Sequence, residues 1–375
     1  MREDSLSVNS FHTSGSSPTA RCRVGLLGFG TVGRAIARRL TGDSAFATRH
    51  LELTHIFDRR AHEKRDASTP PLGAHAGILW TSRVDEVLTS DVDIVVEAIG
   101  GADVAVDWTR AALLAGKSVV TCNKQVVARH GPGLLRLAAR QGRQLKFEAA
   151  VGGAMPIVRA VGDGLAGDRI TRIVAILNGT TNAVLSRMEA LGCPLGEALA
   201  SACANGYAEA DPSDDLDGSD ARAKLAILCA LAFNLRVDPD RIESRSSAAV
   251  APGDFDDARR RGGTIRQLAH AAYAPEASAL TAWVAPALVS RSSLFARTTG
   301  AQNAAVISGA FAGDISISGA GAGGDATAVA VIGDLIAIAR DRAAIVPAPS
   351  LSRPATIHGL ANAARCHELN NAEAV

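Results

Sequence analysis

A glycine-rich turn directly after an apolar segment restricts most strongly how this chain can fold. The turn follows RCRVGLL (21–27), and RAIARRL (34–40) after it has the spacing of a helix. Its residues are Gly28, Gly30 and Gly33 with Thr31 and Val32 between them, in the pattern G-x-G-x-x-G. Glycines at such a turn let backbone N–H groups approach a pyrophosphate at the positive end of the helix. The pattern predicts dinucleotide binding at these residues; the alternative is a packing turn without a ligand.

The turn begins a regular alternation of strands and helices. Strands are predicted at 51–57, 91–100, 117–121 and 144–150, and helices at 103–115 and 131–142. Such an alternation implies βαβ units and a parallel sheet. After Val151 the pattern changes to a strand at 170–177, helices at 195–205 and 219–234, and paired strands at 303–309 and 314–319. The segment 236–300 reads as loop-rich, and 319–341 as a glycine-rich loop before a long apolar helix. The sequence therefore predicts an α/β fold with about two domains.

The composition excludes several classes of function. Lys and Arg number 39 against 38 Asp and Glu, with no long basic stripe, so neither a nucleic acid nor a membrane is an expected partner. No uninterrupted apolar stretch of about 18 residues could span a bilayer. Six cysteines without a C-x-x-C pair indicate reduced thiols, and the absence of a signal peptide adds to an expected location in the cytoplasm. Residues 1–20 are rich in Ser and Thr and predict a disordered tail.

Charged residues at the ends of two predicted strands are candidates for cofactor binding. Asp58 closes the second strand, where an acid binds the ribose hydroxyls of NAD. Arg59 and Arg60 follow directly and suit the 2′-phosphate of NADP, so the choice between NAD and NADP stays open. Lys124 follows the strand at 117–121, at the sheet edge where open α/β sheets bind ligands. Lys124 is thus a candidate contact for the nicotinamide or the substrate; the alternative is an exposed loop lysine.

The most unusual segment is GYAEADPSDDLDGSDARAK (206–224), in which six carboxylates fall within twelve positions before a lysine. A calcium loop of the EF-hand type is excluded. Aligning Gly218 with its sixth position puts Lys224 at the twelfth, where calcium needs a carboxylate. A solvated acidic turn remains an open interpretation for three of the acids, Asp211, Asp214 and Asp217.

Asp220 and Lys224 differ from those three acids. With Ser219 as the N-cap of a helix, Asp220 lies in the first turn and Lys224 lies one turn later on the same face. Between Ala223 and Phe233 the lysine is the only charge in an apolar helix, which predicts a buried helix. A buried lysine needs a carboxylate to compensate its lost hydration, and its perturbed proton affinity suits a general acid or base. The alternative is a surface ion pair.

Six blocks of sequence together resemble the homoserine dehydrogenase family. They are VGLLGFGTVG (24–33), VVTCNK (119–124), FEAAVGGAMPIV (147–158), ILNGTTNAVLSRM (176–188), the acidic segment 206–224 and GAGAGGDATAVAVIGD (319–334). They occur in the family order over about residues 20–340. The resemblance implies an NAD- or NADP-dependent oxidoreductase that interconverts L-homoserine and L-aspartate 4-semialdehyde, on the route to threonine, methionine and isoleucine.

The resemblance also implies roles for single residues. Lys224 is implied as the catalytic proton donor, with Asp220 beside it in the catalytic pair. The substrate is implied to be held by Glu209, Asp215 and Asp220, with Glu209 at its ammonium group. Further cofactor contacts are implied at Lys124, Gly206 and Gly323. A structural monovalent cation, usually sodium, is implied at Glu148, Val151, Gly153 and Met155.

The family fold implies a domain arrangement for the chain. Residues 21–150 with 320–345 would form a Rossmann-like dinucleotide-binding domain, and 151–319 a mixed-sheet α+β domain for substrate binding and dimerisation. A homodimer or a dimer of dimers is therefore implied. Residues 346–375 would be a tail without the regulatory ACT domain of many bacterial members, so feedback inhibition of that type is not expected.

Two other functions remain open from the sequence. An oxidoreductase that acts on a related amino-acid alcohol or aldehyde would use the same scaffold. A non-catalytic NAD(P)-binding regulator would need the glycine-rich turn, but it would not need Glu209, Asp220 and Lys224 together.

Overall fold

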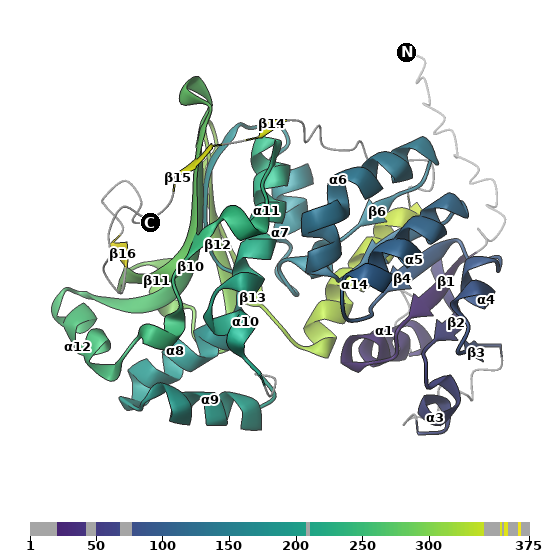
Figure 1. The fold of residues 1–375 in the computed structure, drawn as a ribbon, viewed down its shortest axis with the longest axis horizontal. Coiled ribbons are helices and arrows are strands. Elements are labelled where there is room, and N and C mark those ends of the chain that lie inside the picture. Colours follow the sequence, from purple (N-terminus) through teal and green to yellow (C-terminus); the bar gives the residue numbers. More distant parts are fainter. Residues whose placement is uncertain are drawn as a thin grey trace, which may run out of the picture.

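A computed structural model of the chain shows two large β-sheets joined and covered by helices (Figure 1). It describes residues 21–42, 50–67, 77–207 and 211–340, and the backbone of three short strands beyond them. Glu209, the predicted tail at 1–20 and most of the predicted tail at 346–375 lie outside the described residues. Among the described residues, no helix is both long enough and apolar enough to cross a bilayer.

The first sheet is parallel throughout, as predicted, and its strand order is β3-β2-β1-β4-β5-β6. The strands are β1 (Cys22–Leu27), β2 (Leu51–Phe57), β3 (Leu79–Thr81), β4 (Ile94–Glu97), β5 (Ser118–Thr121) and β6 (Leu145–Lys146). The sequence does not predict β3, because three residues are too few to show a period. The order reverses between β1 and β4, which places a ligand crevice at the carboxyl ends of these two strands.

Two pairs of helices cover the two faces of the first sheet. Helices α5 (Asp103–Leu114) and α6 (Lys124–Arg140) pack their apolar residues against one face. Helices α1 (Thr31–Thr41) and α14 (Gly324–Arg340) pack against the other. The long apolar helix near the end of the chain therefore returns to the first sheet, beside α1 (Figure 1).

The start of α6 differs from the prediction. The sequence predicts a helix at 131–142, yet α6 begins seven residues earlier at Lys124. The Asn123 side chain caps this end by accepting the N–H groups of the second and third helical residues. Lys124 is consequently the first residue of a capped helix, and not the exposed loop lysine of the alternative interpretation.

The second sheet has the order β13-β12-β7-β10-β11-β15 and is mixed. Its main strands are β7 (Ile170–Ile176), β10 (Gly263–Ala274), β11 (Ala279–Ser290), β12 (Gln302–Gly309) and β13 (Gly313–Ala320). The prediction that 236–300 is loop-rich is wrong, because β10 and β11 pair along their whole length as an antiparallel hairpin. The buried polar residues Arg266, Gln267 and His270 interrupt the apolar pattern of β10 and hide the strand in the sequence.

Helix α11 (Ser219–Phe233) connects the two halves of the molecule. One continuous apolar core contains residues of α11, of α5 and α6, and of the second sheet. In Figure 1, α11 lies between the second sheet and α6, which it also contacts. A second packing layer, formed by α8 (Gly179–Leu191), α9 (Leu195–Ala204) and α12 (Pro252–Arg260), covers part of β10.

The remaining elements are short. The helices are α3 (Ala61–Asp66), α4 (Val84–Leu88), α7 (Ile157–Arg159), α10 (Ser213–Leu216) and α13 (Leu294–Arg297). The strands are β8 (Leu235–Arg236), β9 (Glu243–Ser244), β14 (Arg353–Pro354), β15 (Thr356–His358) and β16 (His367–Glu368). The last three belong to the predicted C-terminal tail, and their backbone pairs with β8 and β11.

Candidate active site

The predicted glycine-rich turn has the geometry of a phosphate-binding turn. Gly28 has a φ of +100°, and a Cβ atom there would lie 2.5 Å from the carbonyl oxygen of Ala98. A Cβ atom on Gly33 would lie 2.1 Å from the carbonyl oxygen of Gly28. Both positions therefore exclude larger residues, and α1 begins directly at the turn. The turn lines a cleft of 770 Å³, a volume suited to a dinucleotide.

Asp58 lies in this cleft, but its carboxylate already has several protein partners. It accepts hydrogen bonds from the N–H groups of Phe29 (3.0 Å) and Arg60 (2.9 Å), and it pairs with the Lys64 ammonium at 2.5 Å. Burial alone raises the pKa of this carboxyl, and the bonds from Lys64 and the two amides bring it below its ordinary value. Asp58, the predicted ribose contact, is therefore the anion of an ion pair with Lys64. Lys64 is not among the site residues predicted from the sequence.

A second glycine-rich loop lies against the first. Gly323 has a φ of +109°, and the next residue, Gly324, begins α14. A Cβ atom on Gly324 would lie 3.0 Å from the Thr31 side chain. The predicted cofactor contacts Thr31 and Gly323 are thus neighbours in space, although almost 300 residues separate them. Gly206, in contrast, is an exposed residue with a φ of +73° at the end of α9, outside the residues that line the cleft.

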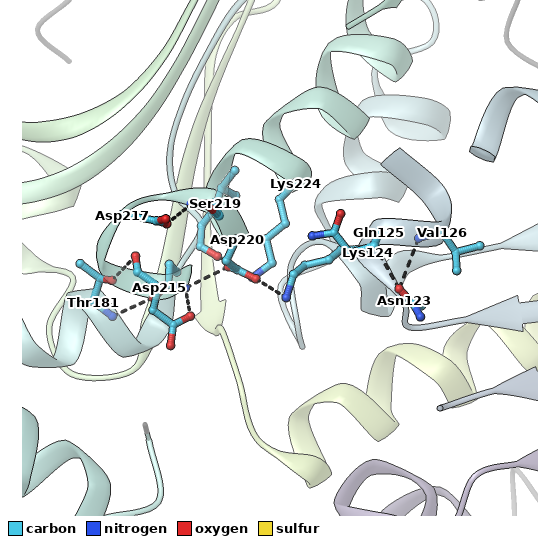
Figure 2. A network of polar contacts seen from close by, with 12 residues as sticks. Asn123, Lys124, Gln125, Val126, Thr181, Asp215, Asp217, Ser219, Asp220 and Lys224 are labelled. Carbon is cyan, nitrogen blue, oxygen red and sulfur yellow. Dashed lines mark hydrogen bonds and ion pairs between the residues drawn. The ribbon is translucent and has the colours of Figure 1, made fainter. Parts of the chain in front are cut away.

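Asp220 is the centre of the acidic segment in space. Its carboxylate pairs with the Lys224 ammonium through Oδ2 and with the Lys124 ammonium through Oδ1, each at 2.7 Å (Figure 2). Burial of Asp220 by itself raises the pKa of the carboxyl, but the two lysine charges outweigh burial and hold that pKa well below its ordinary value. Asp220 is consequently a buried anion that holds two cations in fixed positions.

Lys224 lies inside the protein, as the sequence predicts. Its side chain is 13% exposed. Besides Asp220, its ammonium donates a hydrogen bond to the Leu177 carbonyl oxygen at 2.8 Å. An ammonium group has three N–H bonds, so these two partners leave one for a substrate oxygen.

Asn178 connects Asp215 and Asp220 to the start of α8. It is not among the site residues predicted from the sequence. Its Nδ2 donates to Asp215 Oδ1 at 2.6 Å and to Asp220 Oδ2 at 2.9 Å, while its Oδ1 caps α8 by accepting the Thr181 N–H. Burial is the main cause of a raised pKa for Asp215, with a further contribution from the charge of Asp220. The signal was present in the block NGTTN, where Asn precedes a helix.

The local start of α11 corrects one prediction. The N-cap is Gly218, with a φ of +87°, whereas Ser219 is the first helical residue and accepts a hydrogen bond from the Arg222 side chain. A left-handed residue before the helix suits glycine, because a Cβ atom there costs energy. Asp220 still lies in the first turn, so its predicted position one turn before Lys224 is correct. The outer acids Asp211, Asp214 and Asp217 are exposed.

Backbone and side-chain contacts connect Lys124, and with it Asp220 and Lys224, to the nucleotide cleft. Lys124 begins α6, and the Asn123 side chain donates from Nδ2 to the Gly101 carbonyl oxygen at 2.6 Å. Gly101 directly follows Ile99 and Gly100, which line the cleft. The acidic centre and the glycine-rich turn are therefore held by neighbouring loops at the carboxyl ends of β4 and β5.

At the implied cation site, the carboxylate of Glu148 accepts hydrogen bonds from backbone N–H groups. Glu148 accepts hydrogen bonds from the N–H groups of Val158 (2.8 Å) and Arg159 (2.9 Å) at the start of α7. Burial raises the pKa of Glu148 to about 7. The Met155 carbonyl oxygen accepts the Ile157 N–H at 2.8 Å. The Glu148 side chain therefore does not fit a cation ligand, and only backbone oxygens of the turn from Glu148 to Met155 remain as candidates. No group of three His, Cys, Asp or Glu side chains suited to a metal ion occurs in the described part of the chain.

Comparisons with known proteins agree with this geometry. Two family models match the chain: "Homoserine dehydrogenase, NAD binding domain" at residues 28–148 and "Homoserine dehydrogenase" at residues 156–336. The homoserine dehydrogenase of Corynebacterium glutamicum is 38% identical over 90% of this chain and 76% of its own length. The chain belongs to the homoserine dehydrogenase family.

Other homoserine dehydrogenases are similar in sequence and in structure. That of Mycobacterium tuberculosis is 40% identical over 85% of this chain and 72% of its own length. The crystal structure of the Thiobacillus denitrificans homoserine dehydrogenase has a TM-score of 0.82 at 33% identity, over 91% of this chain and 80% of that chain. A hyperthermophilic archaeal homoserine dehydrogenase in complex with NADPH has a TM-score of 0.70 at 28% identity, over 86% and 98%.

Membership of the family confirms the predicted activity, the predicted nicotinamide cofactor and the predicted fold class. The chain is an oxidoreductase, a homoserine dehydrogenase with a nicotinamide cofactor, which interconverts L-homoserine and L-aspartate 4-semialdehyde. Its α/β fold combines a Rossmann-like parallel sheet with a separate mixed sheet. The alternative of a non-catalytic regulator is therefore rejected.

Proposed function

We propose that Lys224 transfers the proton of the homoserine dehydrogenase reaction and that Asp220 positions it. The observation that carries this proposal is the buried carboxylate of Asp220, which holds the ammonium groups of Lys224 and Lys124 at 2.7 Å each. When bound in the cleft, the nicotinamide supplies or accepts the hydride. The remaining N–H of Lys224 then hydrogen-bonds the oxygen of the reacting carbon and gives it a proton during reduction, or takes it back during oxidation.

The other polar groups bind and orient the substrate. Asp215 is half-buried beside Asp220 and presents a carboxylate suited to the substrate's ammonium group, a role that it would share with Glu209. Asn178 donates to Asp215 and to Asp220 from the same Nδ2 atom, so it holds the two carboxylates side by side. Lys124 adds a second positive charge, which would stabilise the oxygen of the aldehyde or of the nicotinamide amide.

The charges of the cleft favour NADP over NAD. Arg59, Arg60 and Lys64 line it together with a single carboxylate, Asp58, which Lys64 already neutralises at 2.5 Å. A 2′-phosphate is recognised by such cations, whereas NAD needs an acid that is free to accept from the ribose hydroxyls. We therefore propose NADP as the preferred cofactor.

Initial rates of L-homoserine oxidation with each cofactor test this proposal. We expect a higher kcat/KM with NADP, because only NADP carries the phosphate that these cations recognise. A higher kcat/KM with NAD would contradict the proposed use of Arg59, Arg60 and Lys64. In the same assay L-serine and the next longer homologue of homoserine should each react at least about tenfold more slowly, since one methylene shifts the hydroxyl away from Lys224.

Three further proposals rest on the family resemblance and on limited structural support. Residues 21–150 with 320–345 form the nucleotide domain, which agrees with the packing of α14 on α1, and 151–319 form the substrate domain. The chain forms a homodimer or a dimer of dimers through the mixed sheet, which sedimentation would test. A monovalent cation such as sodium binds backbone oxygens of the turn between Glu148 and Met155, and activity in sodium-free buffer would test that binding.

A further inference from the structure

A groove of 440 Å³ lies between α5, α6 and β8, outside the nucleotide cleft. Five arginines line it: Arg110, Arg129, Arg136, Arg140 and Arg236. The residues that line the groove include no Asp and no Glu, although the whole chain has a formal charge of only +1. The positive charge is therefore concentrated at this groove and does not reflect a basic protein.

The spacing of the arginines on α6 gives the groove its shape. Arg129, Arg136 and Arg140 are separated by seven and four residues, so they lie on one face of the helix. Gly133 lies between them, and nothing occupies the space within 4 Å of the position where its Cβ atom would be. The missing side chain leaves an open floor between cationic walls. Arg110 projects from the neighbouring helix α5 and completes the wall.

Most of these arginines lack a counter-charge within the part of the chain that the structure describes. Arg129 pairs with Asp240 at 2.9 Å. The other four are exposed and have no ion pair with any residue in the described ranges. Like charges gathered in this way repel one another, and the repulsion is relieved when an anion binds among them.

We propose that this groove binds a phosphorylated small molecule that carries two or more phosphate groups. Arginine forms paired hydrogen bonds with phosphate oxygens, and several arginines around one space match several phosphates. The volume of 440 Å³ falls within the range of small-molecule sites. Leu114, Pro132 and Leu137 also line the groove, and they offer apolar contact to the rest of the molecule.

The groove is separate from the cofactor site but shares a helix with it. Val104 and Trp108 of α5 line the nucleotide cleft, while Arg110 and Leu114 of the same helix line the groove. Helix α6, the other wall, begins at Lys124 of the acidic centre. A ligand in the groove thus contacts α5, which also lines the cleft, and α6, which begins at Lys124, without using any residue of the cleft.

Calorimetric titration of the full-length protein with inorganic tripolyphosphate tests the proposal. The protein is first saturated with NADP, so that the nucleotide cleft is filled. We expect one saturable site whose affinity falls as salt is raised. The double variant Arg136→Gln/Arg236→Gln should raise the Kd at least about tenfold, because two charge-assisted contacts are lost. The variant Arg291→Gln removes an exposed arginine outside the groove and should leave the Kd unchanged.

Other outcomes would overturn the proposal. Among them are an absence of saturable binding to the wild type and an unchanged Kd in the double variant. Citrate that binds as tightly as tripolyphosphate would show that the site is not selective for phosphate. Binding of a short single-stranded oligonucleotide without binding of tripolyphosphate would point to a nucleic-acid surface instead. Homoserine oxidation measured on the same samples keeps this test separate from the proposed mechanism, because turnover without tripolyphosphate should be the same in the wild type and the double variant.

Discussion

At the scale of single residues, the acidic centre depends on one buried carboxylate. Asp220 is 5% exposed; burial by itself raises the pKa of its carboxyl, and the charges of Lys224 and Lys124 outweigh burial. Burial also affects Lys124: it alone lowers the pKa of that ammonium, and the charge of Asp220 outweighs it and raises the pKa. Asp220 and Lys124 therefore each stabilise the charged form of the other. Asn178 adds a neutral donor, which orients the carboxylate without adding charge.

Replacing Lys224 with alanine tests the role of the proton carrier. We expect kcat to fall by about 10²–10⁴-fold, the usual contribution of a general acid or base. The cofactor Kd should change little, because Lys224 does not line the cleft. Steady-state kinetics and fluorescence titration with NADPH measure the two quantities.

The matched control for that variant is Lys146→Ala, which removes a half-buried lysine of β6. It should retain wild-type kcat. Near-normal turnover in Lys224→Ala would assign proton transfer to another group. Retention of the fold is expected, since Asp220 keeps Lys124 and Asn178 as partners.

At the scale of elements, polar side chains define where two helices begin. The Asn123 side chain starts α6 and thereby places Lys124 beside Asp220. The Glu148 carboxylate starts α7 in the same way, and Asp334 accepts the Glu148 N–H at 2.9 Å and pairs with Arg159 at 2.8 Å. Two buried acids therefore share one arginine. Burial is the main reason that the pKa values of both acids are raised.

The raised pKa of Glu148 predicts a dependence of stability on pH. Its pKa is about 7 in the folded protein against an ordinary 4.5, so between these values the folded state binds more protons than the unfolded state. The free energy of unfolding should therefore decrease as pH rises from about 5 to 8, by at most about 3 kcal/mol from this group.

Urea unfolding at several pH values from 5 to 8 measures this dependence. Glu148→Gln cannot titrate, so its unfolding free energy should decrease less over this range. Glu276→Gln, at an exposed glutamate, should keep the wild-type slope. An equal slope in Glu148→Gln and the wild type would show that Glu148 does not hold the proton.

At the scale of the whole molecule, the chain leaves the first sheet and later returns to it. Helix α14 follows β13 of the second sheet, yet its buried residues belong to the same apolar cluster as those of α1 and β1. At the exposed surface, the Arg38 guanidinium of α1 pairs with Asp325 of α14 at 2.8 Å. The glycine-rich turn and the loop at Gly323 are therefore neighbours in space although the strands of the second sheet lie between them in the sequence.

The variant Val331→Asp tests this dependence. Val331 of α14 is fully buried, so a charge there should destabilise the protein by more than about 3 kcal/mol and weaken NADP binding. Val329→Asp is the matched control, because Val329 lies on the same helix and is 49% exposed. Thermal unfolding and NADP titration of both variants give the comparison. If Val331→Asp bound NADP as tightly as the control, α14 would not support the cofactor turn.

Local patterns in the sequence were sufficient for much of this enzyme. The glycine spacing at Gly28 and the apolar strands gave the parallel sheet, because a buried parallel strand is apolar on both faces. The pair Asp220 and Lys224 was recognisable because one helical turn separates them. Prediction failed where contacts are distant in the sequence: the hairpin of β10 and β11 contains buried polar residues such as Arg266, which pairs with Glu189 of α8 at 2.9 Å.

The sequence by itself determined most kinds of elements, the glycine-rich turn and the lysine that we propose as the proton carrier. Only the tertiary structure decided which groups surround them. Lys124 lies 96 positions before Asp220, and Asn178 lies 42 positions before it, yet both contact the Asp220 carboxylate. No local pattern encodes such contacts, because their geometry depends on how α6, α8 and α11 pack around a shared core.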